Sequence, residues 1–112
     1  MSRGKAIYDE QIRALETGDL DALMQQYADE AVLVRFDKTV IGKANIREFM
    51  KGYIETLGSF KLMSTDKFTE TNDAIFFEAT VLSDHGQAQV YDVFMLRDGK
   101  ITHQFAGVIA PR

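Results

Sequence analysis

Asp92 occupies the position in this sequence that most suggests chemistry. It lies in the segment QAQVYDVFML, residues 87–96, in which side chains alternate between two faces as they do in a strand. The other residues on its face are all apolar: Ala88, Val90, Phe94 and Leu96. A carboxyl group on an apolar face is costly unless it is paired, protonated or coordinated. Asp92 is therefore either a buried acid satisfied by a neighbouring donor or a ligand-facing acid with a perturbed pKa.

Arg35 is a second polar residue in an apolar strand. It belongs to the β-branched run AVLVRF, residues 31–36. A guanidinium keeps its proton in proteins, so Arg35 cannot act as a base. If its side chain reaches the rim of the fold, water solvates it. If it points inward with Leu33, it requires an anion, and Asp92 or an acidic ligand would supply one.

The orientation of His103 depends on the turn RDGK that precedes it. A two-residue Asp98-Gly99 turn would place His103 on the face of Asp92. A three-residue loop with Gly99 at a bulge would place Gln104 there instead. The first arrangement would make a His–Asp pair available for acid–base chemistry.

Metal and cofactor sites have no support in the sequence. The two histidines, His85 and His103, are far apart and there is no cysteine, so none of the usual metal-ligand spacings occurs. The sequence also lacks a glycine-rich phosphate loop and a nucleophile elbow. We therefore expect no metal and no cofactor.

Three helices are expected in the first half of the chain. Apolar residues recur at helical spacing before Gly18, and Asp19 can cap a second helix whose apolar stripe runs to Tyr27. A third helix is expected from Ala44 to Gly58. The remaining segments are typical of strands separated by the turns TND, SDHG and RDGK. This order predicts an α+β layer architecture, in which a twisted antiparallel sheet curls around the helices and leaves a cavity.

The composition predicts one globular domain over residues 1–112. Hydrophobic residues make up 46% of the chain, which is enough for a single core. With 13 basic and 17 acidic residues the net charge is −4, and no basic cluster suggests a nucleic-acid partner. No apolar run reaches the ~20 residues of a membrane span, and the opening MSRGKAIYDE has no apolar signal region. We therefore expect a cytoplasmic protein without a membrane partner.

Three stretches of the sequence, taken in order, resemble a known family: GDLDALMQQYADEAVLV, IGKANIREFM and VYDVFMLRDGKI. The resemblance is to the NTF2-like superfamily, in particular its SnoaL-like and ketosteroid-isomerase-like branch, and it covers essentially the whole chain. It implies a cystatin-like cone, with three N-terminal helices packed on a curved antiparallel sheet around an apolar pocket. It also implies a homodimer through the sheet. Both faces of residues 87–97 are largely apolar, so a second copy would cover the face that the helices leave bare.

The resemblance also suggests roles for individual residues. Asp92 would stay protonated and donate a hydrogen bond to an oxyanion. The resemblance favours the three-residue RDGK loop, with Gln104 lining the pocket and His103 on the outer, dimer-facing side. Tyr27, Phe49 and Met50 match positions that border the family's pocket, although ordinary core packing explains them better than a specific ligand role does. Apart from the resemblance, Tyr53 could add a hydroxyl near the cavity mouth.

At two positions the sequence departs from the isomerases that it resembles. Gln11 stands where they have a tyrosine donor, and Arg35 stands where they have a proton-shuttling carboxylate. Gln11 can still donate through its amide, but less acidically than a phenol, and Arg35 cannot accept a proton. We therefore expect no steroid-type isomerisation by the family's mechanism, while both residues stay candidates for ligand binding.

Three functions agree with these observations. The first is binding of a small, partly apolar molecule by a SnoaL-like protein. The second is an isomerase, cyclase or dehydratase activity that uses Asp92 with Gln104 or His103. The third is a protein-interaction module in which the sheet or the cavity mouth binds another protein. A cavity with convergent polar groups would favour the first two, and a cavity packed shut would favour the third.

Overall fold

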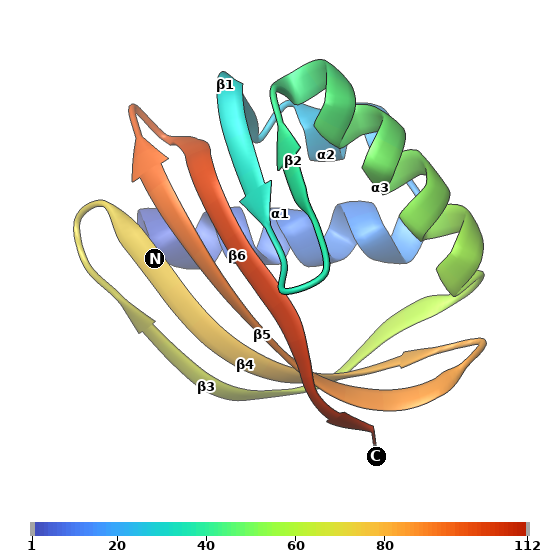
Figure 1. Cartoon of the computed structure of the whole chain (residues 1–112). Coiled ribbons are helices and arrows are strands. Elements are labelled where there is room, and N and C mark those ends of the chain that lie inside the picture. The colour runs from blue at the N-terminus through green and yellow to red at the C-terminus, as the bar shows by residue number, and fades with distance from the viewer. Residues whose placement is uncertain (1, 112) are drawn as a thin grey trace.

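A curved sheet with helices on one side makes up the part of the chain that the computed structural model describes, residues 2–111 (Figure 1). The elements follow one another as α1 (Arg3–Thr17), α2 (Leu20–Met24), β1 (Tyr27–Val34), β2 (Thr39–Ile41), α3 (Lys43–Leu57), β3 (Phe60–Glu70), β4 (Ala74–Ser83), β5 (Gly86–Arg97) and β6 (Lys100–Pro111). Within these residues the strands form one six-stranded sheet in the order β2-β1-β6-β5-β4-β3. The expected α+β class with a curved sheet is confirmed.

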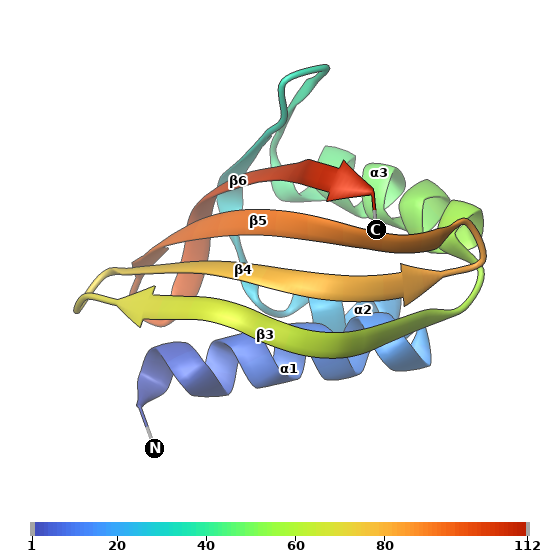
Figure 2. The same ribbon diagram turned by 90° about the horizontal axis from the view of Figure 1, so that it is seen from below.

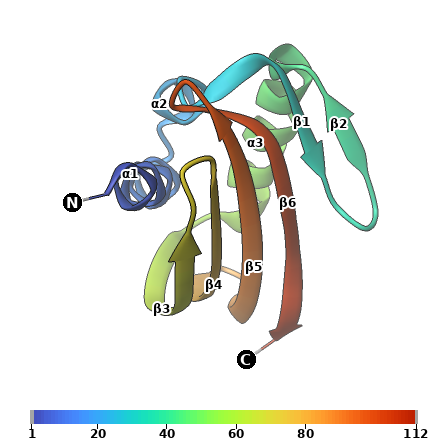
Figure 3. The same cartoon turned by 90° about the vertical axis from the view of Figure 1, so that its left-hand side faces the viewer.

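The sheet bends around the helices and does not close into a barrel (Figure 3). The long strands β3 to β6 lie side by side (Figure 2). α1 contacts β3, near one edge of the sheet, and α3 contacts β1 and β2 at the other edge. The concave face between these helices is therefore enclosed on two sides. No helix within residues 2–111 is long and apolar enough to span a membrane.

The sheet is mixed, so the expectation of a wholly antiparallel sheet is wrong. β1 runs parallel to β6, whereas the other neighbouring strands are antiparallel. β1 reaches this position early in the chain, and α3 and three long strands intervene before β6 returns beside it. The short strand β2, residues 39–41, was not expected; it pairs with the end of β1 at the sheet edge.

The helices do not form an uninterrupted N-terminal group, because β1 and β2 stand between α2 and α3. α2 is also shorter than its apolar stripe predicts, since it ends at Met24 and Tyr27 already begins β1. The backbone N–H of Ile101 donates to the Gln26 carbonyl (2.8 Å), and Lys100 Nζ donates to the Gln25 carbonyl (2.5 Å). These carbonyls are satisfied by β6, so nothing favours a further helical turn.

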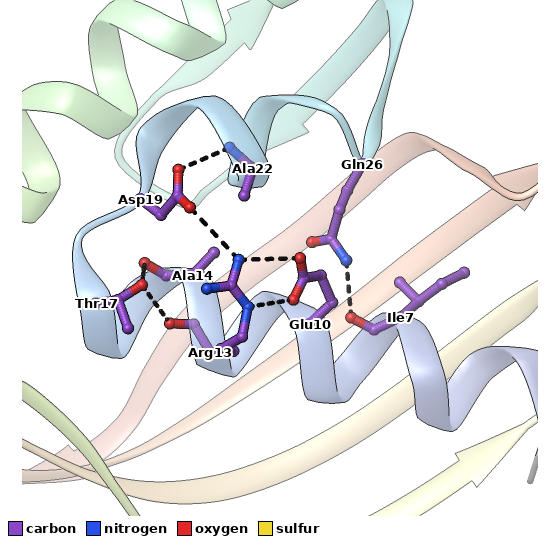
Figure 4. A network of polar contacts seen from close by, with 8 residues as sticks. All are labelled: Ile7, Glu10, Arg13, Ala14, Thr17, Asp19, Ala22 and Gln26. Carbon is purple, nitrogen blue, oxygen red and sulfur yellow. Dashed lines mark hydrogen bonds and ion pairs between the residues drawn. The ribbon is translucent and has the colours of Figure 1, made fainter.

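The junction of α1 and α2 is held by polar contacts (Figure 4). Gly18 ends α1 in the left-handed conformation (φ 68°), which a glycine adopts without steric cost. Asp19 Oδ1 accepts the Ala22 N–H (3.0 Å), and Arg13 bonds both Glu10 and Asp19. The interpretation of the acidic GDLD stretch as a helix cap is therefore confirmed.

The core lies between the helices and the concave face of the sheet. Aromatic rings meet edge-on there: the centroid of Phe77 is 4.5 Å from that of Tyr8 and 5.5 Å from that of Phe94. Leu23 and Ile46 bring α2 and α3 into the same core, and both are completely buried. Each such aliphatic side chain contributes about 1.5–3 kcal/mol through burial, so the helices are fixed to the sheet at several points.

Candidate functional site

A cavity of about 120 Å³ opens between the concave face of the sheet and the helices α1 and α3. Its walls are mainly apolar, and they include Ile12 and Leu15 of α1 together with Val81 and Val90 of the sheet. Five of its lining residues carry a polar group: Gln11, Arg35, Tyr53, Asp92 and Gln104. Apolar walls with a few convergent polar groups are typical of small-molecule sites.

The cavity brings together seven of the eight residues that the sequence singled out. Five of the seven are the polar residues just named, and the other two are Phe49 and Met50. Tyr27 is the exception. It is completely buried and is not among the lining residues, so any effect on a ligand passes through its neighbours.

Gln104 lies at the centre of the sheet. It pairs with Leu33 of β1 on one side and with Phe94 of β5 on the other. Asp92 is two residues from Phe94, so alternation along β5 places it on the same concave face. The two polar side chains therefore meet on a face that is otherwise apolar.

The RDGK turn has two central residues, which makes the expectation of a three-residue loop wrong. Arg97 pairs with Lys100, and Asp98 and Gly99 both have positive φ angles (53° and 77°). Two residues with positive φ are the signature of the type I′ turn that matches the twist of a β-hairpin.

A bulge after this turn nevertheless directs Gln104 inward. The pairing of β5 with β6 shifts by one residue between Met95 and Leu96, so Thr102 is the extra residue on β6. One extra residue exchanges the two faces of a strand. Gln104 is consequently buried, while His103 is exposed on the opposite face. Because His103 does not face the cavity, the alternative of a His103–Asp92 pair is wrong.

A chain of hydrogen bonds ends on the carboxyl group of Asp92. The Tyr27 hydroxyl donates to Gln104 Oε1, and Gln104 Nε2 donates to Asp92 Oδ2 (2.8 Å). Because a phenol can donate to Oε1, this contact fixes the orientation of the Gln104 amide. Gln11 is also buried, and its Oε1 has no hydrogen-bond partner within residues 2–111. An unsatisfied buried oxygen that lines a cavity is available to a ligand or a water molecule.

The environment of Asp92 favours its neutral form. Burial raises the pKa of Asp92 to about 7, against the opposing effects of the Gln104 hydrogen bond and the charge of Arg35. The residue is half-buried, since one side of it lines the cavity. Burial also raises the pKa of Tyr27 and of Tyr53, and in both cases the charge of Asp92 adds to the increase. At slightly acidic pH, Asp92 and Tyr53 are therefore neutral hydrogen-bonding groups, and Arg35 is the charged group among the polar residues that line the cavity.

Arg35 takes the inward of the two positions considered for it, since it lines the cavity as Leu33 does, but its partner is not Asp92. It forms no ion pair with Asp92 and instead contacts Asp37 (Nε–Oδ1 3.1 Å), yet its side chain is only 27% exposed and lines the cavity. Its guanidinium lies 5.5 Å from the Phe49 ring centroid and 5.9 Å from that of Tyr53, which are cation–π distances. The partner Asp37, two residues further along the same turn, was not identified from the sequence.

A family model described as a SnoaL-like domain matches residues 8–104. The chain belongs to the SnoaL-like family. A search of curated proteins found no match. Among solved structures, a candidate polyketide cyclase from Sinorhizobium meliloti is 18% identical, with a TM-score of 0.79 over 96% of this chain and 100% of that one.

Two further solved structures place this SnoaL-like chain in the same fold. A candidate ketosteroid isomerase from Kribbella flavida is 10% identical, with a TM-score of 0.82 over 98% of this chain and 80% of that one. TerC, crystallised with polyporic acid, is 18% identical, with a TM-score of 0.80 over 96% of this chain and 92% of that one. At such low identity the similarity establishes the NTF2-like fold alone.

The site of this SnoaL-like protein can donate and accept hydrogen bonds and can exchange a proton through Asp92. A general acid or base works best when its pKa lies near the pH at which it operates, and Asp92 meets this condition. Within residues 2–111 no group of three or more histidine, cysteine, aspartate or glutamate side chains is arranged to hold a metal ion.

Proposed function

We propose that this SnoaL-like protein binds a small, partly apolar molecule in the cavity and that Asp92 donates a hydrogen bond to an oxygen atom of that molecule. The observation that carries the proposal is the contact between Gln104 Nε2 and Asp92 Oδ2 (2.8 Å). This contact occupies one carboxyl oxygen, and within residues 2–111 Oδ1 has no hydrogen-bond partner. A protonated Oδ1 can donate to a carbonyl oxygen.

The size of the cavity supports a ligand with about one ring. Sites for drug-sized ligands span roughly 300–1,000 Å³, whereas an engineered cavity of about 150 Å³ holds benzene. The cavity here measures about 120 Å³. A ligand with several fused rings would have to extend beyond it.

Calorimetric titration with acetophenone, a ring bearing a ketone, tests the proposal. We expect the Asp92→Ala variant to bind about tenfold more weakly, since one hydrogen bond is lost, and Asp92→Asn to retain most of the affinity because an amide still donates. Ala106→Leu, which fills the cavity from β6, should abolish binding. Asp84→Ala, in an exposed turn, is the matched control. Binding that survives Ala106→Leu unchanged would show that the ligand site lies elsewhere.

A second candidate function is an isomerase, cyclase or dehydratase type of reaction in which Asp92 transfers a proton and Gln104 holds its carboxyl group. The pKa of about 7 favours this candidate, because both protonation states are present near neutral pH. Exchange of the methyl protons of acetophenone in D₂O, followed by NMR, provides a test. Asp92 would remove a proton and return a deuteron, so Asp92→Asn should stop the exchange. A rate no faster than buffer alone would eliminate this candidate.

We also propose a homodimer formed through the outer face of the sheet. Phe76 of β4 pairs with Val93 of β5, which pairs in turn with Phe105 of β6. These three residues therefore form one row across the sheet, on the face away from the helices. Phe76 is 45% exposed and Phe105 is 38% exposed. Neighbouring exposed aromatic residues commonly mark an interface, and twofold pairing is the commonest solution.

A further inference from the structure

Arg35 and Asp92 lie on opposite sides of one small residue, Ala106. Val34 pairs with Phe105, so Arg35, the next residue, continues the row toward Ala106, which itself pairs with Asp92. Neighbouring strands are about 4.8 Å apart, so the main chains of Arg35 and Asp92 are separated by about 10 Å. Ala106 contributes only a methyl group between them, and all three residues line the cavity. A ligand lying over Ala106 can therefore reach both polar groups.

The guanidinium of Arg35 is held in place but not saturated. The Arg35 Nε–H donates a hydrogen bond to Asp37 Oδ1, while within residues 2–111 the Nη donors have no hydrogen-bond partner. The rings of Phe49 and Tyr53 pack against the guanidinium and restrict its movement. A planar group with free in-plane N–H donors is suited to binding a carboxylate through two hydrogen bonds.

The charge around this end of the cavity also favours an anion. The Arg35 guanidinium and Lys38 Nζ both lie against the Phe49 ring (5.5 and 5.4 Å from its centroid), with the carboxylates of Asp37 and Glu48 in the same region. A cationic ligand would be repelled here, and a neutral ligand would leave the Nη donors of Arg35 unused.

We infer that the site selects small organic anions, namely ring-sized carboxylates whose charged group binds Arg35 while a second oxygen at the far end of the ligand binds Asp92. This inference rests on the proposed ligand-binding function and adds the class of ligand. Arg35 is then the residue that determines specificity, in the place where a proton-accepting carboxylate would otherwise be expected.

A pair of probes of equal size tests the inference: 4-hydroxybenzoate, an anion at neutral pH, and its neutral analogue 4-hydroxybenzamide. Calorimetry in dilute buffer should give at least about tenfold tighter binding of the anion, because hydrogen bonds to charged groups are the stronger ones. The Arg35→Gln variant should lose this preference, and Arg35→Lys should retain part of it as a point charge. Arg47→Gln is the matched control, since Arg47 is an exposed α3 residue paired with Asp21 and does not line the cavity.

The possible outcomes separate this inference from the proposed function. If wild-type protein binds both probes equally, the anion selectivity is refuted while ligand binding stands. If the preference for 4-hydroxybenzoate persists in Arg35→Gln, the anion is bound by another group and the role of Arg35 is refuted. If neither probe nor acetophenone binds, the proposed function fails and the inference fails with it. The comparison of the two probes on the wild-type protein requires no variant, so it is independent of how well the variants fold.

Discussion

The raised pKa of Asp92 has a measurable consequence for stability. The carboxyl group titrates near pH 7 in the folded protein and near ~3.9 in the unfolded chain. Between these values the unfolded chain releases a proton that the folded protein keeps, so the free energy of unfolding falls as pH rises and levels off above pH 7. From pH 5 to pH 8 the decrease due to Asp92 is about 2–3 kcal/mol. The Asp92→Asn variant, which cannot ionise, should lack this decrease.

Urea denaturation of wild type and Asp92→Asn at pH 5, 6.5 and 8 measures the effect. We expect the variant to gain about 2–3 kcal/mol relative to wild type across this range. Asp84→Asn is the control. Ser59 lowers the pKa of the exposed Asp84, so any stability that this group provides is present above its unfolded pKa and is lost only at lower pH. The reasoning would be refuted if the free energies of unfolding of wild type and Asp92→Asn differed by the same amount at all three pH values. An Asp92 pKa below ~3.9 in an NMR titration would refute it as well.

Three further predictions concern the neighbours of Asp92 and the outer face. Gln104→Leu should raise the pKa of Asp92 further and Arg35→Gln should raise it by less, because the Gln104 hydrogen bond opposes the increase more strongly than the charge of Arg35 does. NMR titration of the Asp92 carboxyl group measures both changes, and a larger effect of Arg35→Gln would contradict this order. Tyr27→Phe leaves the buried Gln104 Oε1 without its donor, so we expect urea denaturation to show a loss of about 1–3 kcal/mol in the free energy of unfolding; an unchanged value would mean that this bond adds no stability. Phe105→Glu should convert the proposed dimer to monomers in light scattering, and a variant that stays dimeric would argue against the sheet interface.

Local sequence patterns were sufficient for the fold class and for most helix boundaries. Gly18 and Gly58 follow the last residues of α1 and α3, as their positions in the sequence predicted, and Asp19 caps α2. These signals are local because a helix end is decided by the few residues that satisfy or interrupt its own hydrogen bonds. The end of α2 escaped prediction for the same reason, since the donors that reach the Gln25 and Gln26 carbonyls come from β6.

The candidate site could be predicted as a list of residues but not as an arrangement. An acid on an apolar strand face drew attention to Asp92, and motif similarity added Gln11 and Gln104. Nothing in the sequence indicated that Gln104 would connect Asp92 to Tyr27, because these residues lie on three different strands. The same holds for Arg35, whose contacts with Asp37 and with the rings of α3 depend on how the β1–β2 turn lies against that helix.

The sequence by itself determined which side chains alternate on each strand, and the tertiary structure decided which face of β6 points inward. Alternation has a period of two residues, so a single extra residue exchanges the faces. The bulge at Thr102 is such a residue: it turns Gln104 toward Asp92 and leaves His103 outside, although the Asp98-Gly99 turn alone would have done the opposite. Whether a bulge forms depends on pairing with both neighbouring strands, and one of these, β1, is more than 60 residues away in the chain. For this reason the identity of the residue that holds Asp92 is a property of the assembled sheet.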